Sequence, residues 1–180
     1  MSLKRHPADD SIGYLRQGAE LVRKLDDDLF VRSAGGRFRG GVGSQFRHCI
    51  DFYECLLRGL ENEDLVDYAA RTREERLETD RTAAADRLEQ IADRLAAIDP
   101  GSLTRQLKVR SEQPVEGFPE WCASTLHREF QFLVSHTVHH YALIVSLLGQ
   151  LGYELEPEHA DFGVAPSTLA HWNEADQLAG

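Results

Sequence analysis

Three histidines occur within five residues of an apolar segment, at His136, His139 and His140. If this segment is a helix with about 100° of rotation per residue, His136 and His140 lie on its apolar side and His139 on its polar side. Histidines at positions i and i+4 lie one helical turn apart, so both rings can reach one metal ion. A third donor is His48, which borders the apolar stripe of another expected helix. Three neutral imidazoles leave a metal ion with an open position for water or substrate, as in catalytic zinc sites.

The sequence therefore predicts one divalent metal ion held by His48, His136 and His140, although the spacing alone also allows a site without metal. A buried histidine pair can simply hydrogen-bond to backbone carbonyls or to each other. The pattern excludes several known sites. Thr137 stands where a zinc protease has glutamate, and no second Glu-x-x-His motif of a di-iron bundle accompanies the segment from Glu156 to His159.

Three further residues could support the predicted site. Asp51 follows His48 by about one helical turn and could accept its second N–H, although its helical face favours a solvated acid. Glu129 lies seven residues before His136, about 10 Å along a helix axis, which is too far to share the ion. It could line a substrate pocket or cap the buried face. Cys49 points into the apolar arc and is expected in the core.

The composition is that of one globular domain over residues 1–180, since domains are typically about 100–200 residues long. The N-terminal residues turn acidic where a secretory signal would be apolar, and no apolar run has membrane-spanning length, so we expect a cytoplasmic chain without a membrane partner. The formal net charge of -10 repels phosphate, which disfavours nucleic-acid binding. Cys49, Cys55 and Cys122 lack a Cys-x-x-Cys spacing and are expected to be reduced thiols, mostly buried.

Helical periodicity predicts an all-α fold of four helices. The first begins near Asp10 or Ser11 and carries apolar residues as far as Leu29, and five glycines over residues 34–43 then predict a flexible connection. The second begins at a Ser44 cap and continues to Leu60. The third opens with the Thr72 and Glu75 spacing of a capping box. Its apolar residues follow a heptad pattern and comprise Leu77, Ala84, Leu88, Ile91, Leu95 and Ile98.

The rest of the chain is expected to connect and cover this bundle. Residues 103–120 begin with a short alternating stretch, which favours a brief strand near 103–110 or a loop. The fourth helix should span about Ala123 to Leu151 and end at Gly152, because glycine suits a left-handed helix terminus. Residues 153–180 contain two prolines and little periodicity, so they are expected to be an extended tail that wraps the surface.

The order of these features resembles the DinB/YfiT-like superfamily: a histidine in the segment Gln45 to His48, then a histidine pair four residues apart at His136 and His140. The resemblance implies a four-helix bundle with long crossover connections, frequent homodimers, and a three-histidine site for zinc, nickel or a similar ion. Iron, copper or manganese also suit imidazole ligands. The chain departs from the family where Tyr141 follows His140 in place of a His-Arg-Gly-Gln continuation.

For the chemistry, the resemblance implies metal-dependent transfer or isomerisation with a low-molecular-weight thiol such as bacillithiol or mycothiol as the small-molecule substrate. Fold alone does not determine function, so three hypotheses stand. The first is a metal-dependent thiol S-transferase. The second is a non-catalytic, stress-related protein that binds a metal or ligand. The third is a helical dimerisation module whose histidines bind nothing.

Overall fold

The structure is a computed structural model of the chain. It describes residues 6, 8–35, 40–110, 112, 113, 116, 117 and 119–179, with side chains to residue 172. The elements, in order, are α1 (Asp9–Lys24), α2 (Asp27–Val31), α3 (Val42–Glu61), β1 (Leu65–Asp67), α4 (Arg76–Thr79), α5 (Arg81–Ala96), η1 (Pro100–Thr104), β2 (Gln106–Arg110), β3 (Trp121–Thr125), α6 (Leu126–Gln150), η2 (Pro157–His159) and α7 (Pro166–Ala179).

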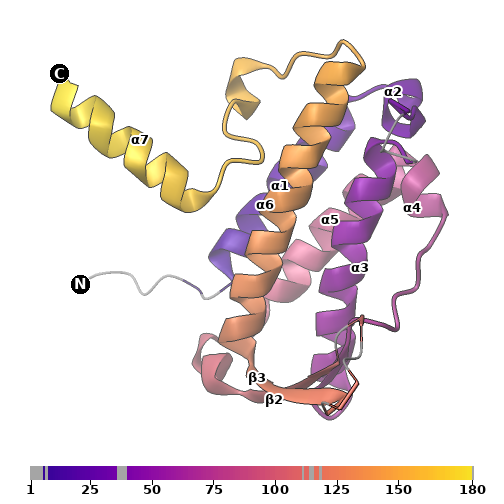
Figure 1. The fold of residues 1–180 in the computed structure, drawn as a ribbon, viewed down its shortest axis with the longest axis vertical. Coiled ribbons are helices and arrows are strands. Elements are labelled where there is room, and N and C mark those ends of the chain that lie inside the picture. Colours follow the sequence, from indigo (N-terminus) through magenta and orange to yellow (C-terminus); the bar gives the residue numbers. More distant parts are fainter. Residues whose placement is uncertain are drawn as a thin grey trace.

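The prediction of a mostly helical fold is confirmed, and α1, α3, α5 and α6 enclose the core (Figure 1). α1 packs against α5 and α6, and α3 packs against the same two helices from the other side. Each of the four presents an apolar stripe to the others. The side chains at the centre of this core are fully buried and include Leu15, Phe46, Ile50, Leu88, Leu133 and Ile144.

The first half of the chain differs from the sequence prediction at the helix ends. α1 ends at Lys24, because the Asp26 carboxylate accepts a hydrogen bond from the Leu29 amide and caps the separate helix α2. α3 begins at Val42 with Gly41 as its cap, and the Ser44 hydroxyl donates to the Gly41 carbonyl. Contrary to the sequence prediction, Ser44 therefore does not cap the start of this helix. Most of the predicted glycine-rich connection, residues 36–39, lies outside the described residues.

The predicted capping box at Thr72 and Glu75 is wrong. Residues 71–74 form no helix, and the Thr72 hydroxyl accepts a hydrogen bond from Arg58. A short α4 comes first, and the Asp80 carboxylate then accepts from the Ala83 amide and caps α5. The apolar pattern itself was informative, because the residues that it placed in the core within α4 and α5 are buried: Leu77, Ala84, Leu88, Ile91 and Leu95.

The described residues form a three-stranded sheet at one end of the helices, of which the sequence indicated only β2, as a brief strand or a loop. β1 pairs with β2 in parallel, with Leu65 opposite Lys108, and β3 pairs with β2 in the antiparallel sense. Because residues up to Thr125 pair with β2, α6 begins at Leu126 instead of Ala123. The Thr125 hydroxyl caps it by accepting from the Arg128 amide.

The C-terminal region is partly helical, which corrects the prediction of an extended tail over residues 153–180. α6 ends as expected, since Gly152 has a φ of +79°. The chain then returns along α6, where the ring of Phe162 stacks on Tyr141 with a centroid distance of 4.2 Å. α7 begins at Pro166, a residue favoured in a first helical turn, and extends away from the other helices (Figure 1).

One helix among the described residues, α6, is long and apolar enough to cross a membrane by length and composition. It also packs against α1 and α3, and helices in protein cores share this composition. The fold therefore gives only weak evidence for a membrane-spanning segment.

Candidate metal centre

The structure brings His48, His136 and His140 together in one cluster, where α3 packs against α6. The ring of His48 lies 5.0 Å from that of His136 and 4.4 Å from that of His140, measured between centroids. One ring nitrogen from each residue lies within 4.8 Å of the other two. His139 is exposed, and its ring meets that of His140 edge-on. The face assignment on α6 therefore agrees with the structure.

A buried hydrogen bond holds the two helices in register beside the cluster. The Thr137 hydroxyl donates to the Leu133 carbonyl, so it accepts from the Tyr53 hydroxyl of α3 at 3.1 Å. Both side chains are fully buried, and a buried polar group that loses its partner is costly. This contact sets how far His136, next to Thr137, stands along α6 relative to α3.

The tautomer of His140 follows from its partner. Its Nδ1 lies 2.8 Å from the side-chain oxygen of Gln45, which can only accept a hydrogen bond. Nδ1 therefore carries the hydrogen, and Nε2 keeps its lone pair. Histidines that bind metals in proteins are held in this way by a carbonyl or carboxylate acceptor on the other ring nitrogen.

His48 has the opposite tautomer, because its partner is a donor. Arg71 donates from Nη1 to Nδ1 of His48 over 2.9 Å. The hydrogen of the neutral His48 ring is then on Nε2, which donates to Nε2 of His136 over 3.2 Å. His136 must consequently carry its own hydrogen on Nδ1. For all three Nε2 atoms to offer lone pairs, the His48 proton would have to move to Nδ1, and the Arg71 donor now on Nδ1 would have to leave.

All three rings are neutral at physiological pH in this arrangement. Burial is the main cause, and it lowers the pKa of His48 to about 3, of His136 to about 4 and of His140 to about 3. The neighbouring imidazoles lower the pKa values of all three rings further, and the positive Arg71 also lowers those of His48 and His136. Neutral imidazole is the form that binds metal ions.

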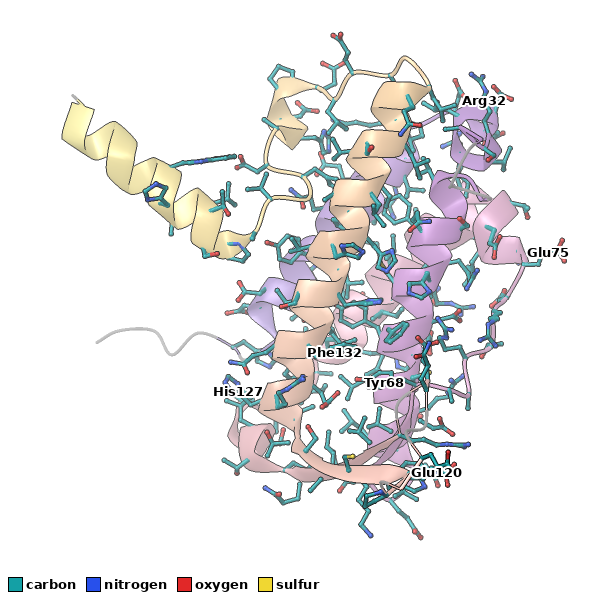
Figure 2. All side chains as sticks on the ribbon, in the orientation of Figure 1. Arg32, Tyr68, Glu75, Glu120, His127 and Phe132 are labelled. Atoms are coloured by element: carbon teal, nitrogen blue, oxygen red, sulfur yellow. The ribbon has the colours of Figure 1, made fainter. Side chains whose placement is uncertain are left out.

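An aromatic wall covers one side of the cluster. The ring of Phe52 lies 4.1 Å from that of His136, and Phe132 lies 5.7 Å from it. Figure 2 labels Phe132 on α6 and Tyr68 after β1, which lie close together with centroids 5.4 Å apart. These rings limit the access of water from that side, which strengthens electrostatic interactions at the histidines.

Glu129 lies behind this wall and does not belong to the histidine cluster. Its carboxylate is buried and accepts hydrogen bonds from the hydroxyls of Tyr68, at 2.8 Å, and Ser124. The expectation that Glu129 is too far along α6 to join the three ring nitrogens agrees with the structure. Its hydrogen bonds connect α6 to β3 and to the segment after β1.

Asp51 and the cysteines complete the residues singled out from the sequence. Asp51 is buried, not solvated, and accepts from the Arg47 side chain and the Arg73 amide. It therefore does not hold His48, whose Nδ1 is occupied by Arg71. Cys49 is a core thiol, as expected, and its burial raises its pKa. Cys55 is also buried, whereas Cys122 is exposed.

Sequence reasoning missed two residues at this site, Gln45 and Arg71. Gln45 lies three residues before His48, which places the two on neighbouring positions of one helix face, so its proximity was readable from the spacing. Arg71 reaches the cluster from an irregular segment between β1 and α4. No periodic pattern connects that segment to either helix, so the sequence held no signal for it.

The donor set fits a divalent transition metal. Two Nε2 atoms lie 3.2 Å apart, close to the separation of about 3.4 Å between tetrahedral ligands with bonds of about 2.1 Å. The three donor atoms lie within 4.8 Å of one another, so they would have to approach one another further to reach tetrahedral spacing. Three imidazoles without a carboxylate suit zinc, nickel, copper and iron better than magnesium or calcium.

Comparisons with known proteins do not assign this chain to a family. No family model matches it, and no solved structure matches it significantly. The chain is similar to FK506-binding protein 5 of Rhizopus delemar, with 32% identity over 108 residues, which are 59% of this chain. The match covers only 27% of the length of that protein.

Proposed function

We propose that this chain is a divalent-metal-binding protein that holds one ion, zinc or nickel, through His48, His136 and His140. The observation that carries the proposal is the hydrogen-bond pattern of the cluster. Nε2 of His136 and Nε2 of His140 carry no hydrogen, with that of His136 accepting from His48, and Gln45 holds His140 in the tautomer that metal sites use. A histidine cluster that served only to fill the core would not need these three rings to converge from two helices.

The arrangement of the helices also supports the proposal. Four long helices with connections through a small sheet are compatible with a four-helix bundle with long crossovers of the DinB/YfiT-like type. We therefore include in the proposal the homodimeric state that this type implies, together with the cytoplasmic location expected from the sequence. The net charge of -10 supports a small-molecule partner over nucleic acid.

The reaction that we propose is the transfer of a low-molecular-weight thiol to an electrophile. A bound ion would supply Lewis-acid activation of the thiol at neutral pH. The protein would contribute neutral imidazole ligands and the apolar wall of Phe52, Phe132 and Tyr68, which excludes water from one side. The alternative is a non-catalytic protein that binds a metal or ligand at the same site.

Metal content tests the site directly. Protein purified without a nickel column should contain close to one equivalent of transition metal by elemental analysis, or take it up and melt at a higher temperature when zinc is added. His48→Ala, His136→Ala and His140→Ala each remove a donor and should lower zinc affinity sharply. His139→Ala is the matched control and should bind zinc as the wild type does. Equal metal content in all four variants would contradict the proposal.

Thiol consumption separates the catalytic proposal from its alternative. The zinc-loaded protein should accelerate the reaction of a small thiol with an alkyl halide, and the rate should return to background in His140→Ala and after chelation. Full zinc binding without any acceleration over a panel of thiols would favour the non-catalytic alternative. No zinc binding at all would favour a plain helical module.

A further inference from the structure

The segment that carries Arg71 is fixed to α3 on both sides of this residue. Before it, Arg58 of α3 donates to the Ala70 carbonyl. After it, the Arg73 amide donates to the buried Asp51 carboxylate, and Arg73 has a φ of +51°, a conformation that costs a non-glycine residue free energy. The backbone at Arg71 is therefore held in place, and only its side chain can move without breaking these contacts.

The Arg71 side chain lies against the histidine cluster and is only 10% exposed. Its guanidinium carbon lies 5.2 Å from the centroid of the Phe52 ring. Nη1 donates to Nδ1 of His48, and Nη2 forms an ion pair with Glu112. Nε is buried and has no hydrogen-bond partner among the described residues. A buried donor without an acceptor is costly, so this position does not satisfy the guanidinium fully.

This position of Arg71 excludes metal binding through Nε2 of His48. When Nε2 of a neutral imidazole binds an ion, Nδ1 carries the hydrogen and must donate it. The guanidinium has no lone pair with which to accept that hydrogen. Nη1 of Arg71 and Nδ1 of His48, now 2.9 Å apart, would then be two facing donors. Arg71 must therefore leave Nδ1 before His48 can become a ligand in this form.

Gln45 and Arg71 act in opposite directions on two rings of the cluster. Gln45 accepts from Nδ1 of His140 and leaves Nε2 of that ring without a hydrogen. Arg71 donates to Nδ1 of His48 and keeps the hydrogen on Nε2, which donates to His136. Two of the three rings are thus in the form that binds a metal ion, and the third is blocked. Protein sites that hold zinc use at least three protein ligands, so this one contact controls the affinity of the whole site.

We propose that Arg71 is a gate on the metal site: it holds metal-free His48 in the tautomer that cannot bind through Nε2, and it leaves Nδ1 when an ion binds. The inference rests on the proposed metal site. Glu112 already pairs with Nη2, so the guanidinium keeps a charged partner when Nη1 leaves His48. Breaking a hydrogen bond from a charged donor lowers metal affinity roughly tenfold or more.

Zinc affinity in a chelator competition measures the gate. Arg71→Met keeps an unbranched side chain over Phe52 and removes the donor, so it should bind zinc roughly tenfold or more tightly than the wild type. Arg71→Lys keeps a donor and the charge, so its affinity should lie between the two. Arg128→Met is the matched control and should bind zinc as the wild type does. It removes a guanidinium 5.7 Å from the Phe132 ring, on the same aromatic wall, that does not hydrogen-bond to the three histidines in the described part of the chain.

Two results of this competition would contradict the gate. If Arg71→Met binds zinc no more tightly than the wild type, the contact with His48 does not limit metal binding. If Arg128→Met tightens zinc binding as much as Arg71→Met does, loss of a nearby positive charge accounts for the gain.

The tautomer of His48 tests the mechanism in the wild-type protein. NMR spectra of the imidazole nitrogens, assigned by comparison with His48→Gln, should show the His48 hydrogen on Nε2 in the metal-free protein and on Nδ1 after zinc is added. A hydrogen already on Nδ1 before zinc is added would overturn the gate and leave the metal site standing. Failure of both the wild type and Arg71→Met to bind zinc would overturn the metal site itself.

Discussion

The neutral histidine cluster should make the metal-free protein sensitive to mild acid. In the unfolded chain the three rings take up protons near the ordinary histidine pKa of 6.5, whereas burial holds the folded-state pKa values at about 3 to 4. Above about pH 6.5 the three rings are neutral in both the folded and the unfolded state, so they give stability no pH dependence. Below it the unfolded state binds more protons, so stability falls as the pH drops from about 6.5 toward about 4.

The magnitude follows from the size of this window. At about pH 5, a ring that stays neutral in the folded state lowers the free energy of unfolding by about 2 kcal/mol relative to neutral pH. Each pH unit below the unfolded-state pKa contributes about 1.4 kcal/mol. The rings are only half-buried, so water screens part of the effect, and about 1–2 kcal/mol per ring is a better figure. The three rings then account for about 3–6 kcal/mol, a large part of the roughly 5–15 kcal/mol that stabilises a typical domain.

Urea unfolding of the chelator-treated protein at about pH 7.5 and about pH 5 measures this loss. We expect the free energy of unfolding to fall less with pH in the triple variant His48→Gln, His136→Gln and His140→Gln. Its decrease between the two pH values should be smaller than that of the wild type by at least about 3 kcal/mol. Each single variant should remove about a third of the effect, whereas His139→Gln should leave it unchanged. If the triple variant and the wild type lose the same free energy, the rings are not held neutral by burial and the reasoning fails.

Three further predictions concern the supports of the site and the core. Gln45→Leu removes the acceptor for Nδ1 of His140 and should weaken zinc binding about 10–100-fold in a chelator competition. Leu88→Ala deletes a fully buried side chain and should cost about 2–5 kcal/mol in urea unfolding, whereas exposed Gln90→Ala should change it by less than about 0.5 kcal/mol. Gly59→Ala places a methyl group 2.6 Å from a side-chain carbon of Val66 and 2.8 Å from its Cα, so it should lower the melting temperature by several degrees.

The sequence predicted the helical faces well, because burial of apolar side chains follows the local period of the chain. The heptad pattern identified Leu88 and Ile91 as core residues before any partner helix was known. The same reasoning placed His136 and His140 on the inward side of α6 and His139 on the outward side, and the structure agrees. The side of a helix on which a residue lies is a local property, and the rotation of about 100° per residue is enough to determine it.

The starts of several helices were predicted poorly, because capping residues compete and tertiary contacts decide among them. Thr72 had the spacing of a capping residue, yet Asp80 caps α5 and Thr72 binds Arg58 instead. Ala123 was expected in α6 but pairs with Lys108 in the sheet. The two outer strands escaped prediction because β1 has only three residues and because both strands depend on pairing with β2, a separate segment of the chain, for their hydrogen bonds.

By itself, the sequence determined which histidines face inward and that one of them, His48, lies on a different helix from the pair. Only the tertiary structure decided that these helices are neighbours, and that the buried Tyr53–Thr137 hydrogen bond sets their register. It also decided what surrounds the cluster, because Arg71 arrives from a segment without periodicity. Local periodicity specifies a direction around one helix axis, whereas the position of a ring nitrogen relative to a donor from another segment depends on packing of the whole chain.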